Sequence, residues 1–185
     1  MNKAIKPTVD WLSIQLVIFD CDGVLSDGKI IYGSNSNLET MELKNFNAHD
    51  GMGFMLLHTA GLLSAVITGR TSSALSKRCK DLRIKHVFQK VQNKLEKADK
   101  LLTKLNLSWS RVVYMGDDWN DIPCMQQAAF SACPSDAMPE IQKLADLVTE
   151  RKAGEGAVRE LIDFILRKKG VYEQVVDSYL REISL

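Results

Sequence analysis

Short apolar runs alternate with helix-like segments along almost the whole chain of 185 residues. The first run, Ile14–Phe19, is rich in β-branched residues and too short for a helix, which is typical of a buried strand. Further strands are expected at 62–67, 86–88, 111–115, 129–132 and 147–148, and helices at 50–58, 71–82, 93–105, 121–128, 138–144 and 156–167. Strands separated by helices form βαβ units, so the sequence predicts an α/β, Rossmann-like fold with a mainly parallel sheet flanked by helices.

One segment interrupts this alternation. Gly28–Phe46 contains two candidate strands, 29–32 and 40–46, with a turn-rich spacer at 33–37. This pattern predicts a protruding β-hairpin. We expect a single domain over residues 1–185, with the hairpin as an insertion at about 28–46 and an amphipathic tail at about 171–185.

Charge and hydropathy exclude several classes of partner. The chain has 24 basic and 23 acidic residues, a net charge of +1, so no global field favours nucleic acid or an anionic membrane. No apolar run approaches the ~20 residues of a membrane span, and residues 1–10 lack the apolar core of a signal peptide. A cytoplasmic location is therefore expected. The four scattered cysteines are interpreted as free thiols: Cys21, Cys79, Cys124 and Cys133.

Two carboxylates follow the first predicted strand, in Asp20-Cys21-Asp22-Gly23. Side chains two residues apart on a strand point to the same side, and Gly23 permits a sharp turn directly afterwards. A divalent cation such as Mg²⁺ would offset the repulsion between the two carboxylates. A solvated turn at the strand end is the alternative.

A hydroxyl and a lysine follow later strands. Thr68, in Thr68-Gly69-Arg70, could bind a phosphoryl oxygen, although a helix N-cap is the better explanation when this motif is taken alone. Lys94 lies at the start of a predicted helix, where the helix dipole favours anions. A solvated surface lysine is the alternative, because the same segment also contains Lys90, Lys97 and Lys100.

The densest acidic cluster is Gly116-Asp117-Asp118-Trp119-Asn120-Asp121, directly after another apolar run. Close like charges are destabilising unless a cation or hydrogen bonds compensate them. An N-cap explains one of these carboxylates but not three. A metal site at the carboxyl ends of the strands is therefore predicted.

These four motifs, in this order, resemble those of the haloacid dehalogenase-like phosphatases over roughly residues 15–166. The resemblance implies that Asp20 is the nucleophile and that Asp22 is the general acid and base. It implies that Mg²⁺ is held by Asp20, the Asp22 carbonyl and Asp117, with Asp118 and Asp121 as auxiliary groups. Thr68 and Lys94 would bind the transferred phosphoryl group.

The spacing leaves no room for a cap domain, because about 45 residues separate Asp22 from Thr68 and about 25 separate Thr68 from Lys94. A capless enzyme either has an open site for a large substrate or closes the site by oligomerisation. The hairpin favours the second, since an isolated two-stranded ribbon is marginally stable.

Further segments resemble the capless 3-deoxy-D-manno-octulosonate 8-phosphate (KDO 8-phosphate) phosphatases of lipopolysaccharide synthesis: 27–28, 46–47, 50–53, 68–70, 78–79 and 156–160. The resemblance implies a homotetramer in which hairpins and C-terminal segments close a neighbour's site. It implies substrate contacts from Asp50, Gly51, Gly69, Arg70, Arg78 and Arg159. The chain departs from this family at His49, Lys90 and Ala153, none of which belongs to the four phosphatase motifs.

Several other functions are compatible with parts of the pattern. The substrate could be a nine-carbon ulosonate phosphate, whose phosphatases tend to have Glu after Thr-Gly, or a range of small metabolites. A receiver-type signalling domain also uses acidic residues, Thr and Lys, but its lysine follows all of its acidic residues, whereas Lys94 precedes Asp117. The last alternative is a catalytically idle scaffold, but such a protein would have no reason to keep all of the following: Asp20, Asp22, Thr68, Lys94 and Asp117.

Overall fold

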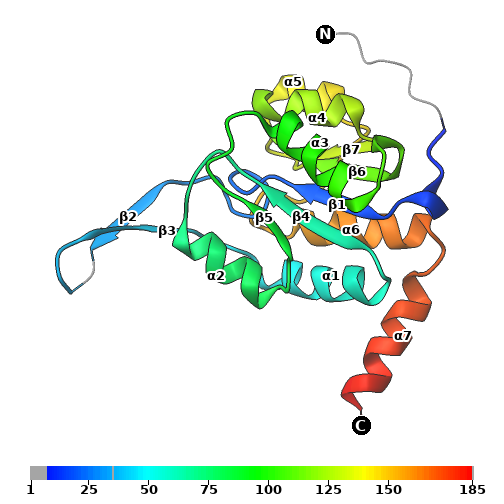
Figure 1. Cartoon of the computed structure of the whole chain (residues 1–185). Coiled ribbons are helices and arrows are strands. Elements are labelled where there is room, and N and C mark those ends of the chain that lie inside the picture. Colours follow the sequence, from blue (N-terminus) through cyan, green and yellow to red (C-terminus); the bar gives the residue numbers. More distant parts are fainter. Residues whose placement is uncertain (1–7, 35, 185) are drawn as a thin grey trace.

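A six-stranded, fully parallel sheet forms the centre of the molecule, in the strand order β5-β4-β1-β6-β7-β8 (Figure 1). The computed structural model describes residues 8–34 and 36–184. The strands are β1 (Leu16–Phe19), β4 (Leu63–Ile67), β5 (His86–Phe88), β6 (Val112–Met115), β7 (Phe130–Cys133) and β8 (Leu147–Val148). The expected α/β architecture is therefore confirmed, with strand ends that differ from the expected ones by a residue or two.

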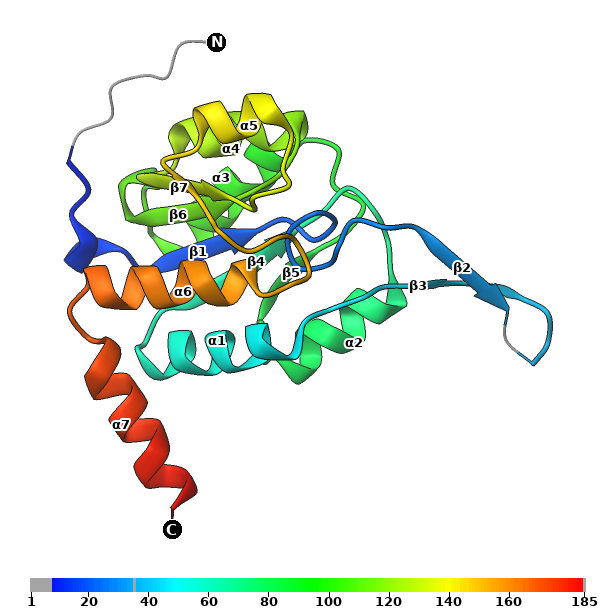
Figure 2. The ribbon, with the colours of Figure 1, turned by 180° about the vertical axis from the view of Figure 1, so that it is seen from behind.

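Helices cover both faces of this sheet (Figures 1 and 2). One face carries α1 (Ala48–Thr59), α2 (Ser73–Asp81) and α6 (Ala157–Lys168), and α7 (Tyr172–Ile183) packs outside them. The other face carries α3 (Lys94–Leu105), α4 (Ile122–Gln127) and α5 (Pro139–Leu144). Alternate β1 side chains enter the two cores, Val17 and Phe19 on the first side and Leu16 and Ile18 on the second.

Short 3₁₀ helices at Trp11–Ser13, Trp109–Arg111 and Trp119–Asp121 were not among the expected elements. The start of α1 also differs from expectation. The helix was expected over 50–58, but α1 begins two residues earlier and Asn47 is its N-cap, accepting a hydrogen bond from the His49 N–H (2.8 Å). Asp50 therefore lies in the first turn of α1.

The hairpin consists of β2 (Ile31–Ser34) and β3 (Thr40–Leu43), and it protrudes from the body in both views (Figures 1 and 2). Residues 33 and 34 were expected in the turn, but they pair with Met41 and Thr40, so the strand extends through them. Residue 35 of the expected turn, residue 185 of the expected tail and residues 1–7 of the segment tested for a signal peptide lie outside the described residues.

The register of the sheet brings the ends of its central strands together. Phe19, the last residue of β1, pairs with Val66 of β4 on one side and with Met115 of β6 on the other. Residues that follow these strands therefore meet at one edge of the sheet, at the crevice where the connections leave in opposite directions. Within the described residues, no helix is long and apolar enough to cross a membrane.

Candidate active site

Asp20 and Asp117 face each other across the ends of β1 and β6. One carboxylate oxygen from each of Asp20, Asp117 and Asp121 lies within 4.8 Å of the others. Gly23 makes this approach possible. Its φ of +78° is one that glycine adopts readily, and a Cβ at this position would lie 2.0 Å from Asp117 Oδ2. The turn after β1 therefore needs a residue without a side chain.

Two oxygens in this cluster are buried without a hydrogen-bond partner among the described residues, Asp20 Oδ1 and Asp117 Oδ1. Burial, followed by repulsion from Asp121, raises the pKa of Asp20 to about 7, although Lys94 opposes this shift. Burial and the Asp20 charge raise the pKa of Asp117 to about 8. Two partly neutralised carboxylates with free, converging oxygens fit a divalent cation that prefers oxygen ligands.

Lys94 is the lysine that reaches this cluster. It is the first residue of α3, its side chain is 2% exposed, and its Nζ lies 2.9 Å from Asp20 Oδ2 and 2.8 Å from Asp121 Oδ1. Burial favours its neutral form, but the Asp121 and Asp20 carboxylates outweigh burial and raise its pKa. Two of the three alternative lysines have other partners, since Lys97 lies over the Phe88 ring and Lys100 pairs with Glu96.

Asp121 differs from the other two carboxylates because donors already occupy both of its oxygens. Oδ1 accepts hydrogen bonds from Lys94 Nζ and from the Tyr114 hydroxyl (2.7 Å), which is fully buried. Oδ2 accepts from the backbone N–H groups of Asp117 (3.1 Å) and Asp118 (3.4 Å). Asp121 is therefore suited to hold Lys94 and the acidic loop in place, and Asp20 and Asp117 supply the free oxygens.

A cavity of about 270 Å³ opens over these carboxylates. Thr68, which is 3% exposed, and Arg70 enter it from the end of β4, together with Asp118 and Asn120 from the acidic loop. The Asn120 side chain also accepts a hydrogen bond from Lys94 Nζ (3.4 Å). Asn120 was not among the residues predicted from the sequence, although it lies inside the acidic motif.

The hairpin contributes two further charged residues that the sequence analysis did not identify. Lys44 forms an ion pair with Asp22, and Glu42 forms one with Arg70. Glu42 and Lys44 are two residues apart, so they share one side of the extended strand, while Met41 and Leu43 are exposed. The alternation of charged residues in the expected strand 40–46 indicates that Glu42 and Lys44 point to the same side. It does not indicate which part of the molecule lies on that side.

Four predicted substrate contacts do not line this cavity. Asp50 Oδ1 accepts a hydrogen bond from the Arg159 N–H in the first turn of α6 (2.9 Å). Arg78 donates to the Asn47 carbonyl (2.7 Å), and a Cβ added to Gly51 would contact Arg78 and Leu82. Asp50, Gly51, Arg78 and Arg159 are therefore brought together around the start of α1, whereas Gly69 and Arg70 are in the cavity.

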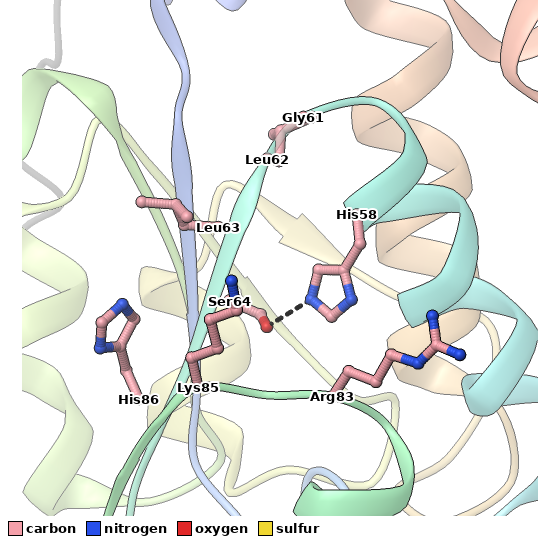
Figure 3. A pocket seen from close by; sticks show the side chains of 8 residues that line it. All are labelled: His58, Gly61, Leu62, Leu63, Ser64, Arg83, Lys85 and His86. Carbon is pink, nitrogen blue, oxygen red and sulfur yellow. Dashed lines mark hydrogen bonds between the residues drawn. The ribbon is translucent and has the colours of Figure 1, made fainter.

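A second cavity, of about 310 Å³, lies at the opposite end of β4 and β5 (Figure 3). The His58 ring points toward the Ser64 hydroxyl, 2.8 Å away, and Arg83, Lys85 and His86 are the other polar side chains around it. Its lining contains no carboxylate and shares no residue with the acidic cluster. The predicted phosphatase motifs therefore contribute side chains to the cavity over Asp20 and none to this second cavity.

Comparison with known proteins gives a consistent result. Residues 80–162 match the family model of the haloacid dehalogenase-like hydrolases. The 3-deoxy-D-manno-octulosonate 8-phosphate phosphatase KdsC of Escherichia coli (strain K12) is 41% identical over 162 residues, which are 88% of this chain and 84% of the relative.

Two solved structures have the same fold. The corresponding phosphatase of Yersinia pestis is 40% identical, with a TM-score of 0.82 over 88% of this chain and 86% of that one. The corresponding phosphatase of Moraxella catarrhalis, solved with magnesium ion, phosphate ion and KDO, is 33% identical, with a TM-score of 0.84 over 91% of this chain and 95% of that one. The fold, the strand-end site and these relatives agree with one another.

Proposed function

The chain belongs to the haloacid dehalogenase-like hydrolases, in the group of the KDO 8-phosphate phosphatases, and from this premise we propose that it hydrolyses KDO 8-phosphate to KDO and phosphate. One observation carries the proposal. Asp20 and Asp117 each have a buried oxygen without a hydrogen-bond partner, and Lys94 lies beside Asp20. These residues follow strands of a fold that this chain shares with its relatives. The enzyme class is phosphoric monoester hydrolase.

The proposed reaction has two displacements at phosphorus. The Asp20 carboxylate attacks the phosphorus atom, and the sugar oxygen leaves as Asp22 gives it a proton. Asp22 then takes a proton from water, the water oxygen bonds to phosphorus, and the bond from phosphorus to the Asp20 oxygen breaks. Asp20 is thereby returned as a free carboxylate.

Three other groups stabilise the transferred phosphoryl group in this proposal. The cation on Lys94 lies beside Asp20 and offsets the negative charge that develops there. The Thr68 hydroxyl at the end of β4 can donate a hydrogen bond to a phosphoryl oxygen. Asp20, Asp117 and the Asp22 carbonyl would hold Mg²⁺, which, when bound, shields the nucleophile from the anionic substrate.

Arg70 is the proposed contact for the carboxylate of the sugar acid. It lines the cavity, its side chain is 42% exposed, and a guanidinium binds a carboxylate through two parallel hydrogen bonds. Four of the residues proposed as substrate contacts do not line the cavity: Asp50, Gly51, Arg78 and Arg159. Their proposed contribution is to hold the start of α1 in the position from which a substrate or a neighbouring subunit is bound.

Closure of the site by neighbouring subunits is also proposed, as a homotetramer in which hairpins and C-terminal segments cover the site. The exposed apolar side chains of the hairpin support it: Ile30, Ile31, Tyr32, Leu38, Met41 and Leu43.

The cytoplasm remains the proposed location, which fractionation of cells would test.

Phosphate release in Mg²⁺ from three parallel substrates tests the activity. KDO 8-phosphate is expected to turn over fastest, ahead of the nine-carbon ulosonate phosphate and of an aryl phosphate. Equal rates on all three would support a broad-specificity phosphatase instead. Absence of release from all three would contradict the proposed function and favour an idle scaffold.

A further inference from the structure

The Lys44 side chain reaches from the hairpin to the Asp22 carboxylate, although it does not itself line the cavity. Lys44 directly follows β3, its side chain is 2% exposed, and its Nζ forms an ion pair with Asp22 Oδ1. The same oxygen accepts a hydrogen bond from the Ser26 hydroxyl (3.3 Å). Two donors therefore hold one specific oxygen of the carboxylate that the proposed function assigns to proton transfer.

The other oxygen of this carboxylate is left free. Asp22 Oδ2 is buried and has no hydrogen-bond partner among the described residues, and its ion-pair partner, Arg70 Nε, lies 3.8 Å away. Asp22 also lines the cavity. Because two donors hold Oδ1, rotation of the carboxyl group is restricted, and Oδ2 is the oxygen that has no hydrogen-bond partner and can carry the transferred proton.

Lys44 is itself held by the hairpin. Its Nζ lies 2.9 Å from Glu42 Oε1, and Glu42 in turn pairs with Arg70. A buried lysine is stable only when it is paired, and here carboxylates on two sides outweigh burial and raise its pKa. Two hairpin residues on the same side of the strand therefore contact the site. Lys44 pairs with Asp22, the proposed proton-transfer residue, and Glu42 pairs with Arg70, the proposed contact for the sugar carboxylate.

We propose that Lys44 is a positioning residue that fixes the Asp22 carboxyl group so that Oδ2 carries the proton, an inference that rests on the proposed function. In the first step, the proton leaves Oδ2 for the sugar oxygen as the bond from phosphorus to that oxygen breaks. In the second step, Oδ2 takes a proton from the attacking water. Both steps fail to reach full rate when the carboxyl group can rotate away.

The test separates the two steps by the choice of leaving group. p-Nitrophenolate leaves as a stable anion and needs no proton, so p-nitrophenyl phosphate should phosphorylate Asp20 of the Lys44→Met variant at a near-normal rate. Hydrolysis of the aspartyl phosphate still needs Asp22 as a base. Rapid-mixing experiments in Mg²⁺ should therefore show a burst of p-nitrophenolate, followed by turnover roughly 10–100-fold slower than in the wild type.

With KDO 8-phosphate both steps need Asp22, so Lys44→Met should lower kcat without a burst and change KM by less than about threefold. Lys29→Met is the matched control. Lys29 pairs with Asp27 next to the same hairpin (3.2 Å), but its side chain is 74% exposed, whereas that of Lys44 is 2% exposed and pairs with Asp22. This control should keep wild-type values for both substrates.

The ratio between the rate constants for phosphorylation of Asp20 and for hydrolysis of the aspartyl phosphate does not depend on the fraction of folded protein. Partial unfolding of the variant therefore does not change the result of this test. Lys44→Arg keeps the charge and should shift this ratio less than Lys44→Met. Equal slowing of both steps with p-nitrophenyl phosphate, or a change in KM alone, would overturn the inference while leaving the phosphatase activity established. A wild-type protein that releases no phosphate would instead contradict the proposed function.

Discussion

Gly23 illustrates how one residue determines the geometry of the acidic cluster. Its backbone has a positive φ, and the space where a side chain would start is filled by the Asp117 carboxylate. Gly23→Ala should displace Asp117 and lower kcat/KM by about 100-fold, because displacements near 1 Å can have effects of this size. Steady-state kinetics with KDO 8-phosphate in Mg²⁺ would measure this.

Gly170→Ala provides the control for backbone strain alone. Gly170 has a φ of +70°, and a Cβ added there would have nothing within 4 Å, so alanine should destabilise the protein by about 1–2 kcal/mol and leave activity unchanged. Similar loss of activity in both variants would mean that strain in the turn, not the approach of Asp117, explains the need for glycine.

Lys94 offers a second prediction at this scale. Lys94→Met leaves Asp20 and Asp121 buried without their cation, so in EDTA the free energy of unfolding should fall by about 3–5 kcal/mol. Urea titration would measure the loss. Lys100→Met is the matched control on the same helix, because its pair with Glu96 is exposed and should contribute less than about 0.5 kcal/mol.

An equal effect of the two lysine substitutions would show that the Lys94 pairs are no more stabilising than a surface pair. It would remove the physical basis for assigning Lys94, rather than a neighbouring lysine, to the site.

The predictable residues were those that follow strands. The sequence indicated Asp20, Thr68 and Asp117 because an apolar run of strand length determines where the strand ends, and parallel strands end at one edge. Lys44 and Glu42 could not be identified in this way. Their spacing of two residues shows that they point to the same side of the extended hairpin strand. Which side faces the site depends on the orientation of the hairpin relative to the sheet, which the sequence does not show.

At the scale of elements, Asp50 connects two helices that are far apart in the sequence. Its carboxylate lies in the first turn of α1, is 2% exposed, and accepts a hydrogen bond from the N-terminal turn of α6. The family resemblance implied a substrate contact for Asp50, which stays a prediction, and nothing local in the sequence indicates that α6 packs against α1. The packing of α6 against α1 therefore determines what the Asp50 carboxylate contacts, and the sequence around Asp50 does not indicate that packing.

This position predicts a pH dependence of stability. Burial raises the pKa of Asp50 from 3.8 to about 6, although the Arg159 N–H and nearby cations oppose the shift. The folded state therefore binds the Asp50 proton more tightly than the unfolded state, and the contribution of this group to stability falls as pH rises from about 4 to about 6. Asp50→Asn, which keeps an acceptor oxygen, should lack this dependence.

Urea unfolding of both proteins at pH 4.5 and pH 7 would measure the effect. The variant should gain stability relative to the wild type on going to pH 7. A difference between the two proteins that is the same at both pH values would contradict the assigned pKa shift.

At the scale of the whole molecule, the hairpin exposes a group of apolar side chains that a monomer leaves in contact with solvent. The proposed homotetramer predicts a mass of four chains by light scattering at micromolar concentration. Replacing Met41 and Leu43 together by Ser should shift the mass toward the monomer, because each side chain is 44% exposed and belongs to the proposed interface.

Leu12→Ser is the control, since Leu12 is 78% exposed and lies outside the hairpin. A monomeric mass for the wild type would contradict the tetramer. An unchanged oligomer in the Met41 and Leu43 double variant would place the interface elsewhere.

The central claim is that Asp20 forms a covalent bond to phosphorus, and chemical trapping tests it most directly. The protein would be mixed with KDO 8-phosphate in Mg²⁺, quenched in acid and treated with borohydride, which reduces an acyl phosphate to an alcohol. Mass spectrometry should then find homoserine at position 20, and this product should be absent from Asp20→Asn and from reactions in EDTA. Turnover without any trapped acyl phosphate, or reduction at another carboxylate such as Asp117, would contradict it.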